Sequence, residues 1–225
     1  DPLWSRGLGD VYKRQIYNKV KSMASKAVLF LSWCLLLGTC GMMSSCDAEN
    51  TISTEYPCHF IFYTQYHVGS SIETALLNQG SYSMVSAGKV NNAWRIYSTL
   101  NDGKNKTETI ALTTAKENYA SYSAIGAGND TKDATKNGFI LGCTNFQGHV
   151  AWDRQCPNCI RQYGGRNYPL EWTGNRQSVS CNKCKRTYAL ETGAITSGGL
   201  SKDDKPLMRY RVSYGGVGTL LTVGN

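Results

Sequence analysis

Short runs that contain apolar and aromatic residues, separated by turn residues, recur along most of the chain and predict β-strands. In residues 208–214 (MRYRVSY), every second side chain is apolar, so one face of this strand should be buried. Cys58–His67 is rich in aromatic residues and should also be a strand, and we predict further strands over Ser81–Ala87, Ala93–Leu100, Thr107–Thr113, Gly138–Thr144, Gly148–Asp153, Tyr168–Trp172, Gln177–Ser180, Thr187–Leu190 and Thr219–Val223. About ten short strands with frequent turns predict an all-β domain.

One segment predicts a helix instead. Ser70 can accept a hydrogen bond from the backbone of Glu73 while Glu73 reaches back, which is a capping box, and Gly80 should end the helix. Residues 115–137 are polar and rich in Gly, Asn and Asp, and we interpret them as a loop. Charged residues make up only 18% of the chain, which also favours strands and turns over long helices.

The first 45 residues are best kept apart from the folded domain. Residues 1–15 resemble translated adapter sequence at the ends of environmental reads, so we leave them out of the fold. Three lysines then precede the apolar run 27–37, and together residues 16–45 predict an export signal. The run is shorter than the ~20 residues of a membrane span.

A cysteine after the apolar run predicts a lipoprotein. Met43-Ser44-Ser45-Cys46 resembles a lipobox, in which small residues precede a cysteine that is lipidated, and polar residues follow directly. Cys40 is the alternative. A diacylated Cys46 would anchor the protein stably to a membrane. We therefore predict a tether over residues 46–57, a domain over 58–225, and a place in the cell envelope, on the periplasmic or outer face of the outer membrane, beside an envelope protein partner.

Two C-x-x-C pairs dominate the second half of the chain: Cys156/Cys159 and Cys181/Cys184, with 21 residues between them. One such pair could be a redox disulfide. Two pairs at this spacing favour one metal ion held by four thiolates, which suits zinc or iron. The metal-binding subdomain should span about residues 152–197.

The other cysteines have a separate interpretation. Cys34 and Cys40 would be removed with the signal, which leaves Cys58 and Cys143 in the exported domain. An oxidising compartment would permit a disulfide between them, and two buried free thiols are the alternative.

Charge gives no support for a nucleic-acid partner. The formal charge of +8 falls to +4 for residues 46–225, which hold 18 basic and 14 acidic side chains. Five basic residues adjoin the cysteine pairs and could compensate the negative charge of four thiolates around a divalent ion; they are Arg154, Arg161, Lys183, Lys185 and Arg186.

The C-terminal third resembles a Rieske domain. Cys181-x-x-Cys184-x-x-x-Tyr188-x-Leu190-x-Thr192-Gly193 is followed by Leu207-x-x-Tyr210-x-Val212 and a last strand preceded by glycine. The whole chain is similar to exported lipoproteins of Gram-negative bacteria that carry such a domain. The resemblance implies an antiparallel β-sandwich and a 2Fe–2S cluster held by two cysteines and two histidines.

The ligands depart from that family, because Cys159 and Cys184 stand where Rieske loops have histidine. His59, His67 and His149 lie outside the motif, and we interpret them as strand residues. Replacing the two imidazole ligands by thiolates removes the feature that raises the reduction potential of a Rieske cluster. Four paired thiolates favour structural zinc, and iron for electron transfer, as a cluster or a single ion, is the alternative.

No catalytic motif is present, and we predict no enzyme activity. Aromatic residues cluster near the cysteine pairs and could either line an exposed ligand surface or form local core; they are Trp152, Tyr163, Tyr168 and Trp172.

Overall fold

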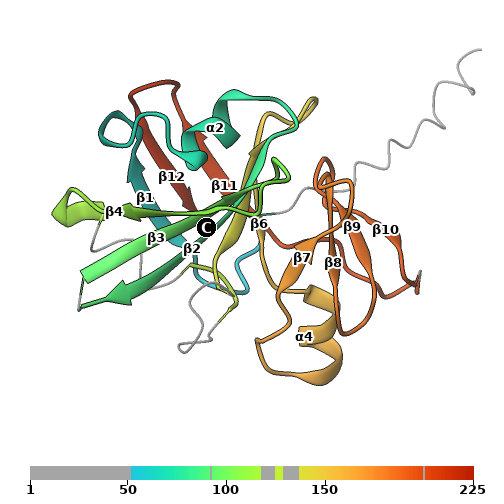
Figure 1. Cartoon of the computed structure of the whole chain (residues 1–225). Helices are drawn as coiled ribbons and strands as arrows, with labels where there is room; N and C mark the ends of the chain where they lie inside the picture. The colour runs from blue at the N-terminus through green and yellow to red at the C-terminus, as the bar shows by residue number, and fades with distance from the viewer. Residues whose placement is uncertain (1–51, 92, 118–124, 129–136, 200) are drawn as a thin grey trace, which may run out of the picture. The chain divides into compact units, whose positions relative to one another are not determined.

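A computed structural model describes residues 52–91, 93–117, 125–128, 137–199 and 201–225, which belong to one compact unit, Asn50–Asn225 (Figure 1). The adapter-like tail, the signal and Cys46 lie outside the described residues, as does most of the predicted loop 115–137. Within the described part, no helix is long and apolar enough to cross a membrane.

The described fold is all-β, as the sequence predicts. Its strands are β1 (His59–Tyr63), β2 (Tyr82–Val90), β3 (Ala93–Leu100), β4 (Thr107–Ala111), β5 (Phe139–Cys143), β6 (His149–Asp153), β7 (Leu170–Trp172), β8 (Ser178–Cys181), β9 (Thr187–Ala189), β10 (Ile195–Ser197), β11 (Arg209–Tyr214) and β12 (Leu220–Gly224). The named helical elements are η2 (Thr64–Tyr66), α2 (Ser71–Leu77) and α4 (Pro157–Tyr163).

Two antiparallel sheets contain these strands. The larger has eight strands in the order β1-β12-β11-β6-β5-β2-β3-β4, and the smaller has four in the order β10-β9-β8-β7. Because side chains alternate between the faces of a strand, β5 directs Phe139 and Leu141 into one core and Ile140 into another. Strands β2 and β6 divide their side chains in the same way, so the central strands of the large sheet are buried on both faces.

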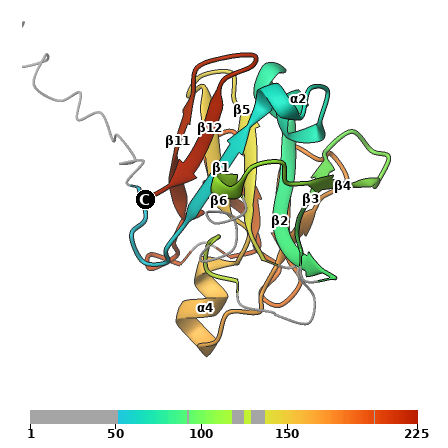
Figure 2. The same ribbon diagram turned by 90° about the vertical axis from the view of Figure 1, so that its left-hand side faces the viewer.

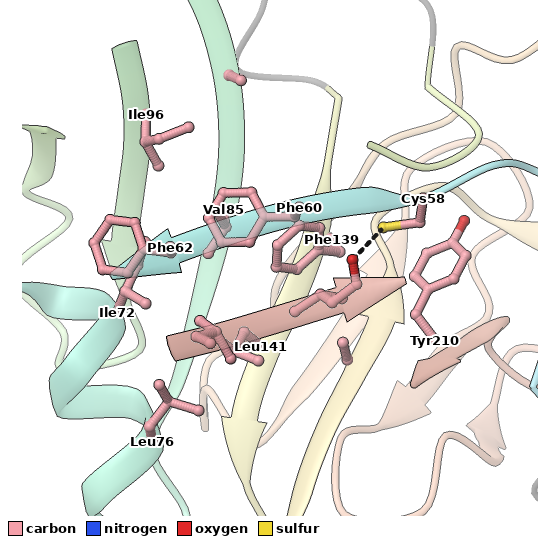
Figure 3. Packing of buried hydrophobic residues seen from close by; sticks show 14 of the residues in the cluster. Cys58, Phe60, Phe62, Ile72, Leu76, Val85, Ile96, Phe139, Leu141 and Tyr210 are labelled. Atoms are coloured by element: carbon pink, nitrogen blue, oxygen red, sulfur yellow. Dashed lines mark hydrogen bonds between the residues drawn. The ribbon is translucent and has the colours of Figure 1, made fainter. Parts of the chain in front are cut away.

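The first core lies on the face of the large sheet that α2 covers (Figure 3). Phe60 of β1 packs edge-to-face against Phe139 of β5, with ring centroids 5.1 Å apart, although three strands separate β1 from β5 in the sheet. Ile72 and Leu76 of α2 are fully buried beside them. The large sheet is therefore curved around this core.

The second core lies on the opposite face and joins the large sheet to the cysteine-bearing segment. Trp152 of β6 is 1% exposed, and its indole Nε1–H donates to the carbonyl of Leu190, just after β9, at 2.9 Å. Tyr188 and Leu170 of the small sheet are fully buried in the same cluster. The small sheet is thus held to the large one by apolar packing reinforced by a hydrogen bond.

The predicted helix is present, with the predicted cap. The Ser70 hydroxyl accepts from the Glu73 amide at 3.3 Å, and the Glu73 carboxylate accepts from the Gly69 amide at 2.6 Å. The strand predicted over Cys58–His67 is too long, because the chain turns into η2 after Tyr63. Strand β10 and helix α4 were not predicted; Pro157 at the first position of α4 is a helix-start signal that the cysteine motif obscured.

Cys58 and Cys143 do not form the disulfide considered above, because both are free thiols. Strands β1 and β5 run in the same direction, and Cys58 precedes the start of β1 whereas Cys143 ends β5, so the two cysteines lie at opposite ends of the sheet. At about 3.3 Å per residue along a strand, this separation exceeds the Cα–Cα distance of about 6 Å that a disulfide requires. Cys58 is buried in the first core and its thiol faces the Val223 carbonyl at 3.8 Å (Figure 3).

A buried carboxylate ends β6. Asp153 is inaccessible to solvent and accepts hydrogen bonds from the Tyr210 hydroxyl and from the backbone amides of Ala127 and Gln155, at 2.6 to 2.7 Å. Burial outweighs these donors and raises the pKa of Asp153 to about 6. A second buried carboxylate, Glu117, behaves oppositely: although burial opposes its ionisation, hydrogen bonds from His67, Tyr63 and Thr113 lower its pKa to about 2.

These shifts predict a specific pH dependence of stability. Because the folded state binds the Asp153 proton more tightly than the unfolded chain, whose Asp pKa is about 3.9, stability should rise as the pH falls from 7 to 5. With a folded pKa of about 6, the gain is about 1 kcal/mol over this range. The stabilisation from ionised Glu117 is fully present above about pH 4.5 and is lost only as the pH falls from there toward about 2. It therefore does not change the stability between pH 7 and pH 5.

The Asp153→Asn variant tests this prediction, since the amide cannot titrate. Denaturant unfolding of metal-loaded protein should show the wild type gaining about 1 kcal/mol relative to the variant between pH 7 and pH 5. Both proteins carry the same cysteines, so the pH dependence of metal binding cancels in the difference. Parallel stability curves for the two proteins would contradict the assignment.

Candidate metal centre

The two cysteine pairs come from two separate local structures. Cys156 is the N-cap of α4 and Cys159 lies in its first turn, so the helix presents both sulfurs at its start. Cys181 ends β8, and a tight turn carries the chain through Cys184 to β9. Strands β8 and β9 are paired, so the second cysteine pair sits at one end of a hairpin.

The four sulfur atoms converge, as the sequence predicts. All four lie within 4.8 Å of one another, with Cys156 Sγ 3.6 Å from Cys184 Sγ and Cys159 Sγ 3.5 Å from Cys181 Sγ. Bonds of about 2.3 Å from zinc to sulfur place the corners of a tetrahedron about 3.8 Å apart. The spacing therefore fits four ligands of a single ion, and these cysteines could hold a metal ion.

The hairpin turn brings backbone amides to the ligands. Its amide at Lys185 donates to the Cys181 carbonyl at 2.9 Å, and Lys185 has a φ of +62°. A lysine in this left-handed region carries some strain, which the turn imposes to reverse the chain within four residues. In this conformation the backbone N–H groups of Lys183 and Cys184 are directed at the Cys181 sulfur.

These contacts determine which thiol loses its proton most readily. A hydrogen bond from Cys156, followed by the two backbone amides, lowers the pKa of Cys181 despite its burial. The hydrogen bond to Cys181, together with burial, raises the pKa of Cys156, and burial raises that of Cys159. A divalent cation would favour the thiolate form of all four, so metal binding must release protons.

A buried polar network supports the first pair. The Tyr188 hydroxyl is 3.2 Å from Cys156 Sγ and accepts from Asn158 Nδ2 at 2.9 Å. Asn158 also pairs with the backbone of Lys205, donating to its carbonyl at 2.8 Å and accepting from its amide at 2.9 Å. Asn158 and Tyr188 therefore connect the start of α4, strand β9 and the segment before β11 around one ligand.

One side of the centre is open to solvent. Cys156, Cys159 and Cys181 are buried, whereas Cys184 is half-buried. The guanidinium of Arg186 hydrogen-bonds to Cys184 and forms a two-pronged ion pair with Asp204, at 2.8 and 3.1 Å. This guanidinium lowers the pKa of Asp204. Arg186 thus places positive charge against the exposed ligand.

The other basic residues near the cysteines differ in role. Lys183 directs its ammonium group over the ring of Tyr163, 5.0 Å from the centroid, and supplies its backbone amide to Cys181. Arg161 lies close enough to Asp204 to help lower its pKa. Arg186 is therefore the basic residue whose side chain hydrogen-bonds to a ligand sulfur.

The aromatic residues near the cysteine pairs form local core rather than one exposed surface. Trp152 is fully enclosed, and Tyr168 and Trp172 pack partly buried against the second core. Only Tyr163 of the four is exposed, at 51%. The histidines also lie away from the described metal centre: His67 pairs with Glu117, and His149 bonds to the Leu76 carbonyl.

The sequence predicts the four ligands but not the residues that hydrogen-bond around them. Asn158 lies inside the C-x-x-C motif, where turn geometry alone gave it no role. Tyr188 belongs to the Rieske-like pattern, although nothing in the pattern indicated that its hydroxyl contacts a sulfur. Asp204 lies 20 residues beyond Cys184 and pairs with Arg186 only because the chain returns past the centre.

Compared with known proteins, the chain matches no protein-family model and no curated protein. The interpretation of the metal centre therefore depends on its own geometry.

Replacing Cys181 with serine should abolish retention of a stoichiometric metal ion and lower the melting temperature. Cys181 is buried, and its sulfur contacts both Cys156 and Cys159. A serine hydroxyl is a much poorer zinc ligand than a thiolate. Cys143→Ser is the matched control, because Cys143 is a free thiol outside the cluster. Metal content by mass spectrometry and thermal unfolding measure both effects. Equal metal content in the two variants would disprove the four-cysteine assignment.

Proposed function

We propose that this protein is an exported, lipid-anchored domain in which one structural zinc ion, held by Cys156, Cys159, Cys181 and Cys184, stabilises a platform for interactions at the cell envelope. The observation that carries the proposal is the convergence of four sulfurs within 4.8 Å. In this role the ion binds where α4 meets the β8–β9 turn, so that metal binding contributes directly to folding.

The sulfur spacing supports one ion over a two-iron cluster. In a 2Fe–2S cluster, two irons and their bridging sulfides lie between the two thiolate pairs, so ligands of different irons are farther apart than ligands of the same ion. Here all four sulfurs lie within 4.8 Å of one another, which fits four ligands of the same ion. Four ligands at one tetrahedron also leave no position for a substrate, which favours a structural role.

The predicted export route supports zinc over iron. The signal contains lysines but no twin arginine, so we expect the chain to be exported unfolded. A preassembled iron–sulfur cluster would not persist through such a route, whereas zinc can bind to the thiolates after the chain has folded outside the cytoplasm.

The Rieske-like fold is part of the same proposal. A small sheet that carries a ligand turn and packs on a larger antiparallel sheet supports the resemblance, as does the pattern from Cys181 to Val212. In this proposal the chain keeps the Rieske-like fold but has lost the two histidine ligands that set the reduction potential of a Rieske cluster, because Cys159 and Cys184 stand in their places.

The alternative function is electron transfer by iron at the same four cysteines. The half-buried Cys184 favours it, because an exposed ligand gives an electron a short path to a partner. A single iron would accept the same tetrahedral set of thiolates.

Metal analysis separates the two functions. We expect the purified chain from Asp47 onward to be colourless and to contain one zinc per molecule. A red or brown protein with charge-transfer bands in its visible spectrum and stoichiometric iron would establish the alternative and overturn the zinc assignment. The same preparation of Cys181→Ser, which should contain neither metal, is the control for adventitious binding.

The lipid anchor can be tested separately in a Gram-negative host fed a labelled fatty acid. The full chain should incorporate the label, and Cys46→Ser should lose it, because acylation requires the thiol of this residue. Cys40→Ser should be labelled like the wild type. Labelling that persists in Cys46→Ser but disappears in Cys40→Ser would move the anchor to the earlier cysteine.

A further inference from the structure

Basic side chains gather around the exposed side of the metal centre. They belong to three segments: the end of α4 with the residues after it (161–166), the β8–β9 turn (182–186) and the loop 201–205 before β11. Figure 2 shows α4 projecting at the end of the compact unit opposite α2. The three segments contain seven basic residues: Arg161, Arg166, Lys183, Lys185, Arg186, Lys202 and Lys205. We call the surface that these seven residues form the basic face.

Direct contacts hold the three segments beside one another. Asn158 of α4 donates to the Lys205 carbonyl at 2.8 Å and accepts from the Lys205 amide at 2.9 Å, which joins the helix to the third segment. The ammonium group of Lys183 lies 5.0 Å from the centre of the Tyr163 ring, which joins the turn to the helix. The two-pronged ion pair described above joins the turn to the third segment. The basic face is therefore one continuous surface rather than three separate groups of charges.

The charge of the basic face exceeds what the metal centre requires. The same segments contain two acidic residues, Asp203 and Asp204, so their side chains carry a net charge of +5 apart from the cysteines. Four thiolates around a divalent ion have a net charge of −2. The basic face and the loaded metal centre together therefore keep a charge of +3, and compensation of the thiolates explains only part of the basic face.

Most of this positive charge is accessible to solvent. Arg186 is half-buried and paired with Asp204, whereas the other six basic residues are exposed. Of the two acidic residues, Asp204 is engaged in that pair, so Asp203 is the exposed acidic residue of the three segments. Six exposed cations beside one exposed carboxylate produce a positive potential that attracts an anionic partner.

The composition of the basic face favours a lipid surface over an acidic protein. Four of its seven cations are lysines, and lysine is depleted in protein–protein interfaces. Clusters of four to eight Lys and Arg are typical of surfaces that bind anionic phospholipids. Tyr163, 51% exposed, lies among these cations, and its ring with a polar tip suits the boundary between membrane and water.

The first described residues of the chain also lie against the basic face. The guanidinium of Arg166 lies 5.1 Å from the centre of the Tyr56 ring, and Tyr56 shares a small apolar cluster with Ile160 of α4. The segment that would follow a lipid anchor at Cys46 thus enters the described domain beside the basic face. This contact is compatible with a membrane at the basic face.

We propose that the basic face docks the protein on the surface of a membrane that contains anionic phospholipids, with Arg and Lys side chains bound to the headgroup phosphates. It rests on the proposed function in one respect, since export to the cell envelope supplies such a membrane. The docking itself needs no acyl chain. Together with a lipid anchor it gives the two signals that stable membrane attachment requires. Docking also covers Cys184, the half-buried ligand that the basic face surrounds.

Cosedimentation with vesicles tests the docking, using the metal-loaded chain from Asp47 onward, which contains the whole compact unit and lacks the acylated cysteine. The protein should bind vesicles of equal parts phosphatidylcholine and phosphatidylglycerol but not vesicles of phosphatidylcholine alone. Binding should be lost at about 1 M salt, where charges are screened over about 3 Å. Arg161→Gln/Lys202→Gln should lower the partition coefficient about 30-fold, because each cation near an anionic surface contributes about a factor of five.

The matched control is Lys104→Gln/Lys106→Gln, which removes the same charge from exposed positions in the β3–β4 turn. In that turn, Asn105 accepts from the Arg176 guanidinium at 2.7 Å. Arg176 precedes β8, whereas the turn of the basic face follows β8, so the control positions lie at the other end of the small sheet. This variant should bind the anionic vesicles like the wild type.

A wild type that does not bind the anionic vesicles, binding that persists at high salt, or an equal loss in the control would each overturn the docking. So would binding to a polyglutamate peptide by a protein that does not bind the vesicles, because it would assign the basic face to an acidic protein. Near-ultraviolet circular dichroism and metal content must match the wild type to show that the variants fold. Loss of vesicle binding with one zinc retained refutes only the docking, whereas a full chain that is not acylated refutes only the anchor.

Discussion

Burial of β2, β5 and β6 on both faces is the constraint on which the rest of the structure depends. One face of these strands packs against β1, α2 and β12, while the other receives the small sheet and the cysteine-bearing segment. Alternation of side chains makes this possible with a short stretch of sequence, since consecutive residues of β5 belong to different cores. Loss of either core would leave an apolar face of the same strands open to water.

The metal centre lies on the second of these cores, and this location explains its chemistry. Packing against Trp152, Leu170 and Leu190 holds the start of α4 beside the β8–β9 turn. Asn158, Tyr188 and the backbone at Lys205 then set the position of Cys156. A cation at the four sulfurs would link the start of α4 to the β8–β9 turn and so add to the packing that holds these two segments together.

The described molecule has two regions of different character, the candidate metal centre and a group of exposed apolar residues. Ligands, supporting hydrogen bonds and the Arg186–Asp204 pair lie together on the small sheet and its loops, while the exposed apolar residues lie largely at one end of the large sheet. Glu191 is the residue that relates the two regions, because it follows β9 in sequence but holds the turn that presents Phe146.

The sequence by itself determined the all-β class, most strand positions, the cap of α2 and the four cysteines that meet. These features depend on local alternation, on a short-range capping bond and on a motif with fixed spacing, all of which can be recognised within a few residues. Tertiary structure decided that Cys58 and Cys143 remain apart, that Trp152 is core, and that Asp204 meets Arg186. Those outcomes depend on which strands become neighbours and how the sheet curves, and this is set by the sum of many long-range contacts rather than by any local pattern.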